Sequence, residues 1–218
     1  MCGRFTLAAP SEELVEVFSV PVPDFDLRPR YNVAPGQDAL VVGEDRRGRR
    51  MGTLRWGLVP AGAREAGKPF ANARAETVGR TPSFRGAFLQ RRCLVPADGF
   101  YEWRRQAGGK TPFVFRPVVG GILALAAVWE RWEVSGHPPR DGFALVTVAA
   151  NEDVAPVHHR MPALVAPADF HLWLDRSSRP ERLQELLVPA QAGTLRCHRV
   201  SQRVNSVSED DAGLVEPV

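Results

Sequence analysis

The sequence predicts one α+β domain in which antiparallel, barrel-like sheets curl around a shared core and short helices lie at the rim. Three observations lead to this prediction. Apolar or alternating runs short enough for strands outnumber helix-like segments. The candidate helices are brief, and most begin at or near a proline. The 218 residues contain no internal repeat and no change of composition that would mark a linker.

The first expected element is a capped amphipathic helix over residues 10–18, where Pro10, Ser11 and two glutamates precede spaced apolar residues. Residues 28–37 are predicted to form an ordered loop, because prolines and a glycine interrupt them. Strands are expected, in chain order, at residues 39–42, 52–58, 93–96, 99–104, 113–115, 122–129 and 143–150.

Helices are expected at residues 83–90, 167–174 and 180–187. Two basic, glycine-containing segments, 43–50 and 106–110, are predicted to be the tips of hairpins. The whole chain, residues 1–218, is expected to form the domain. Its acidic and poorly patterned tail, from about residue 208, is expected to fray.

Composition narrows the class of protein. No run reaches the roughly 18 consecutive apolar residues of a membrane span, and the first residues lack the layout of a signal peptide, so a cytoplasmic protein is expected. Cys2, Cys93 and Cys197 are odd in number and include no C-x-x-C, which argues against a disulfide framework and a zinc site. The net charge is +3, and 26 of the 28 basic residues are arginine. Arginine grips phosphates and stacks on bases, so composition permits nucleic-acid binding without demanding it.

The cysteine at position 2 has unusual chemical potential. Because Cys2 is small, an aminopeptidase is expected to remove Met1, which would leave an α-amine and a thiol on one residue. The reference pKa values of these groups are about 7.7–8.0 and about 8.5. Such an aminothiol condenses with an aldehyde to an imine and then closes through sulfur to a thiazolidine ring. The alternative is an ordinary surface cysteine beside a frayed terminus.

Polar side chains also occur in segments that otherwise suit a core. Asn72 and Arg74 would face the same side of an extended stretch. Glu102 interrupts an apolar strand, where an unpaired carboxylate would be costly. Two adjacent histidines directly precede Arg160. Taken singly, each has an ordinary structural explanation, such as a local backbone hydrogen bond or a salt bridge.

Together with other segments, they form an ordered set of motifs that resembles the SRAP family (SOS response-associated peptidase), whose members are also called abasic site processing proteins. The motifs are Cys2-Gly3-Arg4-Phe5, Tyr31-Asn32-Val33-Ala34-Pro35, Arg55-Trp56-Gly57-Leu58, Asn72-Ala73-Arg74-Ala75-Glu76-Thr77, Arg92-Cys93-Leu94-Val95-Pro96, Gly99-Phe100-Tyr101-Glu102-Trp103 and His158-His159-Arg160-Met161-Pro162. The resemblance extends from residue 2 to about residue 205. It implies a compact α+β fold with a basic channel for single-stranded DNA and the N-terminal cysteine on the channel floor.

The resemblance implies that Cys2 crosslinks to abasic sites in single-stranded DNA by forming the thiazolidine. The H-x-R-M-P spacing matches His158, rather than the neighbouring His159, to the family's catalytic histidine, which we assign to opening the sugar. Glu102 matches a glutamate that shuttles protons at the α-amine and the sugar, and burial would raise its pKa toward that task. Asn72 matches an asparagine that holds the cysteine and the opened sugar.

DNA contacts are implied for further residues. Side chains expected to clamp phosphates around the lesion are Arg4, Arg74, Arg85 and Arg160. Trp56 and Trp103 are expected to stack on neighbouring bases or to wedge between them. Phosphate contacts combined with stacking would bind DNA of any sequence, as recognition of a lesion requires.

Two side activities and two rival functions accompany this interpretation. An imine at the abasic C1′ permits β-elimination, so a minor lyase activity is expected, and the family name implies a peptidase that removes its own Met1. One rival is an N-terminal-nucleophile cysteine amidohydrolase or peptidase, which would turn over an amide. The other is a non-covalent binder of single-stranded DNA with an inert Cys2.

The expected partner is single-stranded DNA that contains an abasic site, and no membrane is involved. Neither a metal nor an organic cofactor is called for by the sequence. A monomer is expected, located in the cytoplasm and associated with the nucleoid when it is bound to DNA. Its expected role is to protect the lesion during the response to DNA damage.

Overall fold

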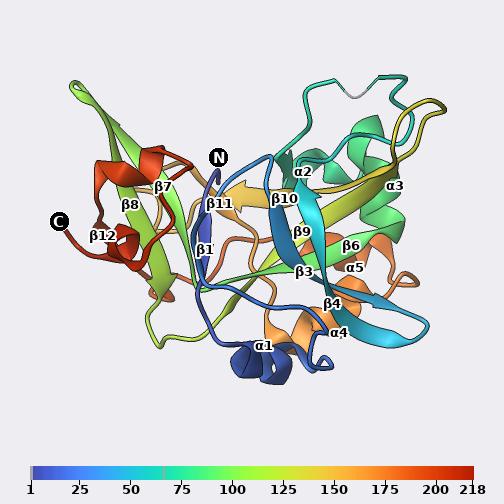
Figure 1. The fold of residues 1–218 in the computed structure, drawn as a ribbon, viewed down its shortest axis with the longest axis horizontal. Coiled ribbons are helices and arrows are strands. Elements are labelled where there is room, and N and C mark those ends of the chain that lie inside the picture. Colours follow the sequence, from blue (N-terminus) through green and yellow to red (C-terminus); the bar gives the residue numbers. More distant parts are fainter. Residues whose placement is uncertain (1, 66) are drawn as a thin grey trace.

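The computed structural model describes residues 2–65 and 67–218, and their strands form two sheets that lie side by side (Figure 1). The larger sheet contains β3 (Asp38–Asp45), β4 (Gly48–Trp56), β5 (Asn72–Arg74), β6 (Arg92–Ala97), β9 (Leu123–Trp132), β10 (Arg140–Ala149) and β11 (Arg160–Pro162). The smaller sheet contains β1 (Phe5–Leu7), β2 (Arg30–Val33), β7 (Gly99–Gln106), β8 (Gly109–Pro117) and β12 (Leu195–Arg199). Sheets and short helices in one compact unit confirm the predicted α+β class.

Strand β10 organises the larger sheet because it pairs along both edges. It runs antiparallel to β9 at one edge and parallel to β4 at the other, and pairings through β3 and β6 complete the circuit. The sheet therefore closes on itself, as the barrel-like prediction requires. The parallel pairings of β10 with β4 and β5 depart from the predicted antiparallel pattern. Long connections join these strands, so no hairpin turn forces them to run in opposite directions.

The C-terminal end of β10 holds a strand on each side. Thr147 of β10 pairs with Arg74 of β5 and also with Pro162 of β11. Two segments that lie far apart in the sequence are thereby fixed to one short stretch of backbone. These segments carry the N-A-R and H-H-R-M-P motifs.

The smaller sheet has the order β12-β8-β7-β1-β2. Strand β7 pairs with β8 from Phe100 to Gln106, but it pairs with β1 only at Gly99 and Phe100. Beyond Tyr101, this second edge of β7 therefore has no strand partner within the described residues. Gly99 is required because a Cβ there would lie 2.9 Å from the carbonyl oxygen of Phe115.

One apolar cluster draws on both sheets. Trp56 of β4 lies with its ring centroid 5.2 Å from Phe5 of β1 and 6.1 Å from Phe143 of β10. All three rings are buried, and full burial of a phenylalanine side chain stabilises a fold by about 1.5–3 kcal/mol. A second, smaller cluster includes Tyr101 and Leu214 and joins the smaller sheet to the C-terminal segment.

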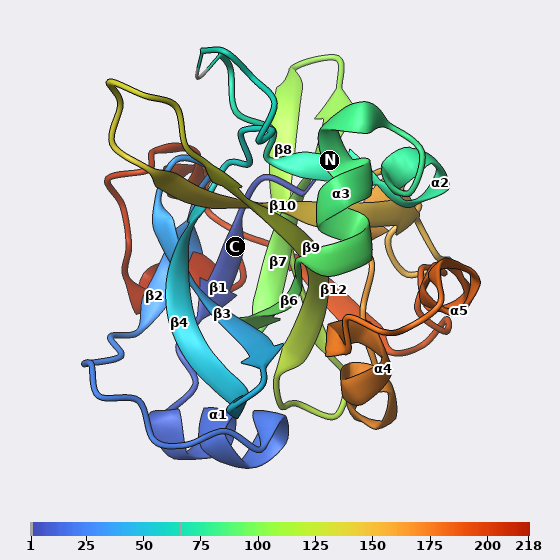
Figure 2. The ribbon, with the colours of Figure 1, turned by 90° about the vertical axis from the view of Figure 1, so that its right-hand side faces the viewer.

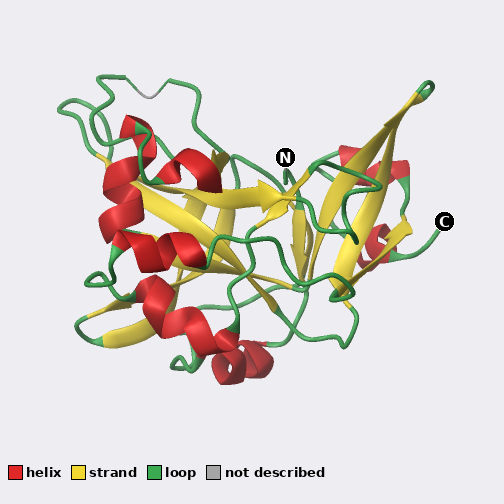
Figure 3. Cartoon of the chain, turned by 180° about the vertical axis from the view of Figure 1, so that it is seen from behind, coloured by secondary structure: helices red, strands yellow, loops and turns green. Residues whose placement is uncertain are grey.

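Short helices lie along one side of the larger sheet and at its lower end in Figure 2, and Figure 3 shows the chain from behind. They are α1 (Ser11–Phe18), α2 (Ala75–Val78), α3 (Pro82–Gln90), α4 (Phe170–Leu174) and α5 (Pro180–Glu185), with the 3-10 turn η1 (Pro167–Asp169) before α4. Helix α1 forms because Leu14 and Phe18, four residues apart, bury one face. The cap predicted for it is wrong, since Pro10 takes the cap position and no side chain caps the helix. None of the helices in the described part of the chain has the length and apolar character needed to span a bilayer.

The loop predicted over residues 28–37 contains a strand instead. Strand β2 pairs with β1, with Val33 opposite Phe5, and Asp210 accepts a hydrogen bond from the backbone N–H of Asn32 at 3.0 Å. The prolines that suggested a loop flank β2 and do not enter it. The prediction failed because the partners of this strand are distant in the sequence.

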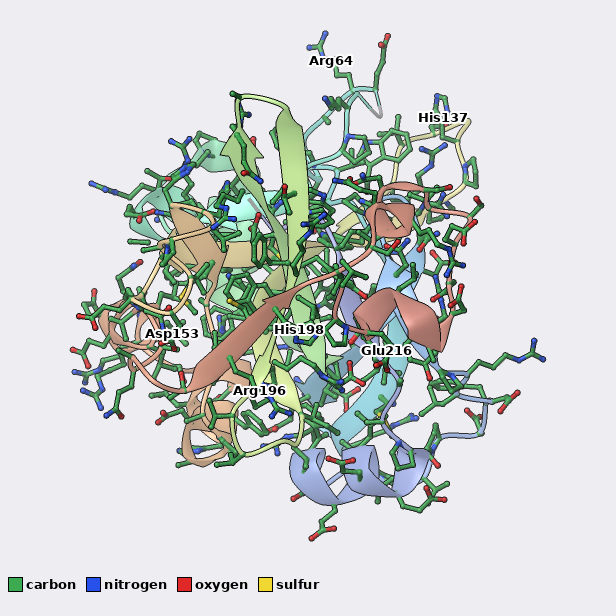
Figure 4. The ribbon with its side chains drawn as sticks, turned by 90° about the vertical axis from the view of Figure 1, so that its left-hand side faces the viewer. Arg64, His137, Asp153, Arg196, His198 and Glu216 are labelled. Atoms are coloured by element: carbon green, nitrogen blue, oxygen red, sulfur yellow. The ribbon has the colours of Figure 1, made fainter. Side chains whose placement is uncertain are left out.

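The acidic tail, predicted to fray from residue 208, is packed against the smaller sheet. The 3-10 turn η3 (Ala212–Val215) buries Leu214, and Arg203 forms ion pairs with Glu209 and Asp211. His198 Nε2 lies 2.8 Å from the carbonyl oxygen of Val215, on the face that Figure 4 shows. The acidic residues are therefore structural partners rather than solvated charges.

Candidate active site

Cys2 lies where the two sheets meet, in the segment that leads into β1. Its side chain is 0% exposed, and Sγ lies 3.7 Å from the carbonyl oxygen of Arg4. Burial, followed by the negative charge of Glu102, raises the pKa of the Cys2 thiol. Met1, whose removal is predicted, lies outside the described residues.

Strand β5 places Asn72 beside Cys2. Asn72 Nδ2 donates a hydrogen bond to the carbonyl oxygen of Cys2 at 3.0 Å. The backbone of Asn72 pairs in parallel with Leu145 of β10, so its position is fixed by the larger sheet. Asn72 therefore ties the backbone of Cys2 to the larger sheet.

Glu102 approaches the same region from β7. The backbone N–H of the preceding Tyr101 donates to the carbonyl oxygen of Arg4 at 3.0 Å, which aligns β7 with the Cys2 segment. The Glu102 side chain is 2% exposed, and this burial raises its pKa to about 7. A hydrogen bond from the Trp103 backbone N–H opposes that rise. The carboxyl group is therefore able to exchange protons near neutral pH.

His158 faces Glu102 from the loop before β11. Its Nδ1 lies 3.7 Å from Glu102 Oε1 and accepts the backbone N–H of Arg160 at 3.0 Å. Burial lowers the pKa of His158, which favours the neutral ring. The neighbouring His159 is exposed, with its ring centroid 4.4 Å from that of His158. The structure thus brings His158, and not His159, beside the glutamate.

Arg160, predicted to clamp a phosphate, is already engaged. Its guanidinium donates to both carboxylate oxygens of Glu76, at 2.6 and 3.0 Å, and also to the carbonyl oxygen of Thr147. The same contact lowers the pKa of Glu76. Because Arg160 also donates its backbone N–H to His158, the pair with Glu76 helps to fix the loop that carries the histidine.

The other predicted arginines differ in how freely they face solvent. Arg4 is partly buried and donates to the carbonyl oxygens of Gly3 at 2.9 Å and Asn205 at 3.4 Å. Arg74, at the end of β5, and Arg85, on α3, are exposed. Neither of the exposed arginines forms an ion pair within the described residues. Their positive charges are available to a ligand.

The two predicted tryptophans lie in opposite environments. Trp56 is 0% exposed in the main core, where its Nε1 donates to the carbonyl oxygen of Ala71 at 2.8 Å. The prediction that Trp56 stacks on bases is therefore wrong, because no face of its ring reaches solvent. Trp103 is partly exposed, and its Nε1 donates to Asn205 Oδ1 at 2.8 Å.

A pocket of about 560 Å³ opens beside these groups. Its lining consists of Glu102, Trp103, Arg105, Gly108, Lys110, His158, Gln202 and Asn205. The hairpin residues and the two amides are not among the predicted site residues. A basic hairpin tip was a visible signal, but nothing local showed that the 3-10 turn η2 (Gln202–Asn205) returns to the site.

The arrangement suits proton transfer at a backbone or side-chain group of Cys2. A neutral imidazole and a carboxyl group that titrates near neutral pH face each other, and Asn72 holds the adjoining backbone. Within the described residues, no group of three or more His, Cys, Asp or Glu side chains is arranged to hold a metal ion. At the surface, Arg74 and Arg85 supply positive charge, and Trp103 supplies a partly exposed indole ring.

The chain is similar to known proteins over nearly its whole length. The sequence model of the family described as "SOS response associated peptidase (SRAP)" matches residues 1–207. "Abasic site processing protein YoqW" of Bacillus subtilis (strain 168) is 36% identical over 222 residues, which cover 99% of each chain. "Abasic site processing protein HMCES" of Gallus gallus is 32% identical over 230 residues, which cover 88% of this chain and 67% of that protein.

The fold is also similar to solved structures. A crystal structure of a protein from Bacteroides thetaiotaomicron superposes with a TM-score of 0.90 and covers 100% of both chains. Its sequence is 22% identical to this one. At this identity the likeness supports the architecture of the two sheets and their helices.

Proposed function

The chain belongs to the SOS response-associated peptidase (SRAP) family, and from this premise we propose that it crosslinks covalently to abasic sites in single-stranded DNA. The relatives described above are named abasic site processing proteins, which supports an action on this lesion. In this proposal, removal of Met1 makes Cys2 the first residue. The resulting adduct shields the lesion during the response to DNA damage.

The proposed reaction uses both nucleophiles of Cys2. The α-amine attacks the aldehyde carbon C1′ of the opened sugar, and loss of one water gives an imine. The thiol sulfur then adds to the imine carbon, and the thiol proton passes to nitrogen. The product is a thiazolidine ring, in which C1′ is bonded to the nitrogen and the sulfur of Cys2. One water is released overall. No oxidant or reductant is needed.

His158, Glu102 and Asn72 each have a role in this scheme. His158, as a neutral imidazole, exchanges the proton that opens the ring form of the sugar. Glu102 accepts a proton from the α-ammonium and returns it to the departing hydroxyl, a task that suits a pKa of about 7. Asn72 holds Cys2 so that the amine and the thiol can reach the same carbon.

One observation carries the proposal. Asn72 Nδ2 donates a hydrogen bond to the carbonyl oxygen of Cys2 at 3.0 Å, on the residue whose thiol pKa is raised first by burial and then by the negative charge of Glu102. Once Met1 is removed, the new α-amine belongs to the very residue that these groups surround. Glu102 and His158 are then placed to transfer the protons that imine formation requires.

DNA binding would rest on the arginines and the tryptophan at the surface of the site. Arg74 and Arg85 can contact phosphates directly, and Trp103 offers a partly exposed ring for stacking. Arg4 and Arg160 begin from internal contacts, so a phosphate would have to compete with Asn205 or Glu76 for them. Trp56 takes no part in stacking and supports the core instead.

The proposal includes further properties. The imine intermediate permits β-elimination, which gives a minor lyase activity. Removal of Met1 proceeds by self-processing or by an aminopeptidase. The protein acts as a monomer in the cytoplasm, at the nucleoid when it is bound to DNA, and without a membrane partner.

The direct test mixes Met-trimmed protein with a single-stranded oligonucleotide that contains one abasic site. Mass spectrometry first verifies that Cys2 is the first residue. A retarded band that survives boiling on a denaturing gel is expected for the wild type. It should be missing with Cys2→Ala and with an oligonucleotide that has no abasic site.

The opposite result would redirect the assignment. If verified wild-type protein gives no heat-stable band, crosslinking is rejected. Turnover of amide substrates would then support the hypothesis of an N-terminal-nucleophile amidohydrolase. Equal DNA affinity of the wild type and Cys2→Ala, without any adduct, would leave a non-covalent binder.

A further inference from the structure

The pocket beside Glu102 is lined in part by hairpin β7–β8. Beyond Tyr101, one edge of β7 has no strand partner within the described residues, because β1 pairs only with Gly99 and Phe100. Glu102 and Arg105 lie on opposite faces of β7, and both line the pocket. Hairpin β7–β8 then projects from the body of the molecule, as Figure 1 shows.

Two cations face each other on this hairpin. Arg105 lies directly opposite Lys110 in the antiparallel register, so both side chains leave the same face of the hairpin. Like charges at directly opposed positions destabilise a strand pair. Both residues are exposed, and neither forms an ion pair within the described part of the chain. An anion bound between them would remove the repulsion.

The neighbouring basic side chain, that of Arg104, already contacts an aromatic ring. The Arg104 guanidinium lies 4.9 Å from the ring centroid of Phe113, which is a cation–π contact. Arg104 alternates with Arg105 along β7 and so faces the other side of the strand. Charge at the pocket therefore comes from Arg105 and Lys110.

A chain of amides also lines the pocket. Trp103 Nε1 donates to Asn205 Oδ1 at 2.8 Å, Asn205 Nδ2 donates to Gln202 Oε1 at 2.5 Å, and Gln202 Nε2 donates to the carbonyl oxygen of Lys110 at 3.0 Å. This chain ties turn η2 to hairpin β7–β8. The oxygen and the nitrogen of each amide are both engaged, so the hydrogen-bonded chain is rigid. The two cations are therefore the groups of the pocket that can bind a ligand.

We propose that Arg105 and Lys110 form a binding site for one backbone phosphate of the DNA strand that flanks the abasic site. The site is continuous with Glu102 and His158, which line the same pocket. A strand whose lesion lies at Cys2 would then place a flanking phosphodiester between Arg105 and Lys110, on one face of hairpin β7–β8. The inference rests on the proposed crosslinking function and adds a contact that fixes how the strand leaves the site.

A second basic hairpin offers a matched control. Arg46 and Arg47 lie exposed at the turn of hairpin β3–β4, on the opposite side of the molecule in Figure 1. There the cations next to the turn are neutralised, since Arg49 pairs with Glu44 at 3.3 Å and Arg50 pairs with Asp45. Removal of two positive charges from either hairpin changes the net charge equally.

The test compares the wild type with two double variants, Arg105→Gln with Lys110→Gln and Arg46→Gln with Arg47→Gln. Affinity for an intact single-stranded oligonucleotide is measured by fluorescence anisotropy over a range of salt concentrations. Loss of one phosphate contact should lower the slope of log affinity against log salt by about 0.7 in the Arg105 and Lys110 variant. The Arg46 and Arg47 variant should keep the wild-type slope.

Neutral linkages locate the contact on the DNA. Oligonucleotides that carry one abasic site and a single methylphosphonate at successive positions are tested for binding. At one flanking position the neutral linkage should weaken the wild type but have no further effect on the Arg105 and Lys110 variant.

Two outcomes would overturn the inference while crosslinking by the wild type still stands. One is an unchanged salt slope in the Arg105 and Lys110 variant. The other is that every neutral linkage weakens both proteins alike. Failure of the wild type to crosslink would instead count against the proposed function.

Discussion

The site has an inner half and an outer half that differ in how their side chains are held. The buried or partly buried inner half consists of Cys2, Asn72, Glu102 and His158. The exposed outer half consists of Arg74, Arg85, Arg105 and Lys110. Neighbouring groups orient the inner side chains before a ligand arrives. The outer cations form no ion pair within the described residues.

This difference separates two kinds of mutational effect. Oriented, buried groups act on the rate of a chemical step, because their geometry is set in advance. Exposed cations act on affinity and on its dependence on salt, because they displace the counterions of the phosphates. A substitution in either half should therefore leave the signature of the other half nearly unchanged.

The largest effect is expected from Cys2→Ser. The α-amine remains and can still form the imine, but the hydroxyl does not close a stable ring. The heat-stable adduct should disappear, and strand scission by β-elimination should increase. Both products can be quantified on one denaturing gel. An adduct with wild-type heat stability would rule out thiazolidine closure.

Glu102→Gln should slow crosslinking by about 100-fold or more, the usual contribution of a general acid–base group. Since the pKa of Glu102 is raised to about 7, the carboxylate form is scarce below that pH and predominates above it. The wild-type rate should therefore rise as the pH increases through about 7. The variant should lose this inflection and keep any that belongs to the α-amine.

Single-turnover rates at saturating DNA, from well below to well above neutral pH, measure this effect. Affinity for intact DNA serves as the control and should stay close to the wild-type value. A variant that binds DNA poorly but reacts at the normal rate would move Glu102 to the outer half.

The two tryptophans test the same division through stability. Trp56→Ala should lower the free energy of unfolding by about 3–5 kcal/mol, since it empties a fully buried site. Trp103→Ala should instead weaken DNA binding by about 1–3 kcal/mol, the value of one stacked base. Denaturant unfolding and anisotropy titrations distinguish the two. Equal loss of stability in both variants would mean that Trp103 is structural.

The smallest effect is expected from Arg85→Gln. Loss of one exposed contact should reduce the salt slope by about 0.7 and leave the crosslinking rate at saturating DNA close to that of the wild type. Arg182→Gln on α5 is a suitable control, because Arg182 is exposed and ion-paired with Glu185. If both variants shift the slope equally, the effect of Arg85 is one of net charge alone.

Much of the fold could be predicted because its strands have strong local patterns. The run at residues 99–104 predicts a strand, which β7 confirms, and Glu102 is the carboxylate within it. Helix α3 and the two hairpin tips also followed from local composition. Strand β2 and the packed tail did not, because their stability depends on Asp210 and Asn32, which lie far apart in the chain.

The site was only partly predictable for a related reason. An aromatic residue in a strand can face either the core or the solvent, and the sequence near Trp56 does not say which. The ring proved to be enclosed by Phe5 and Phe143, each far away in the sequence. The same limit applies to Asn205, whose place beside Trp103 depends on a turn near the other end of the chain.

The contact between Arg4 and Asn205 spans 201 residues, which has a consequence for the order of synthesis. A ribosome delivers Cys2 early, and only near the end the turn η2, which contacts Arg4 and Trp103. Contacts between such distant segments form late, after the intervening chain has emerged. A half-made chain would thus carry Cys2 without the contacts that turn η2 makes beside it. The N-terminal segment therefore acquires its full set of contacts only late in synthesis.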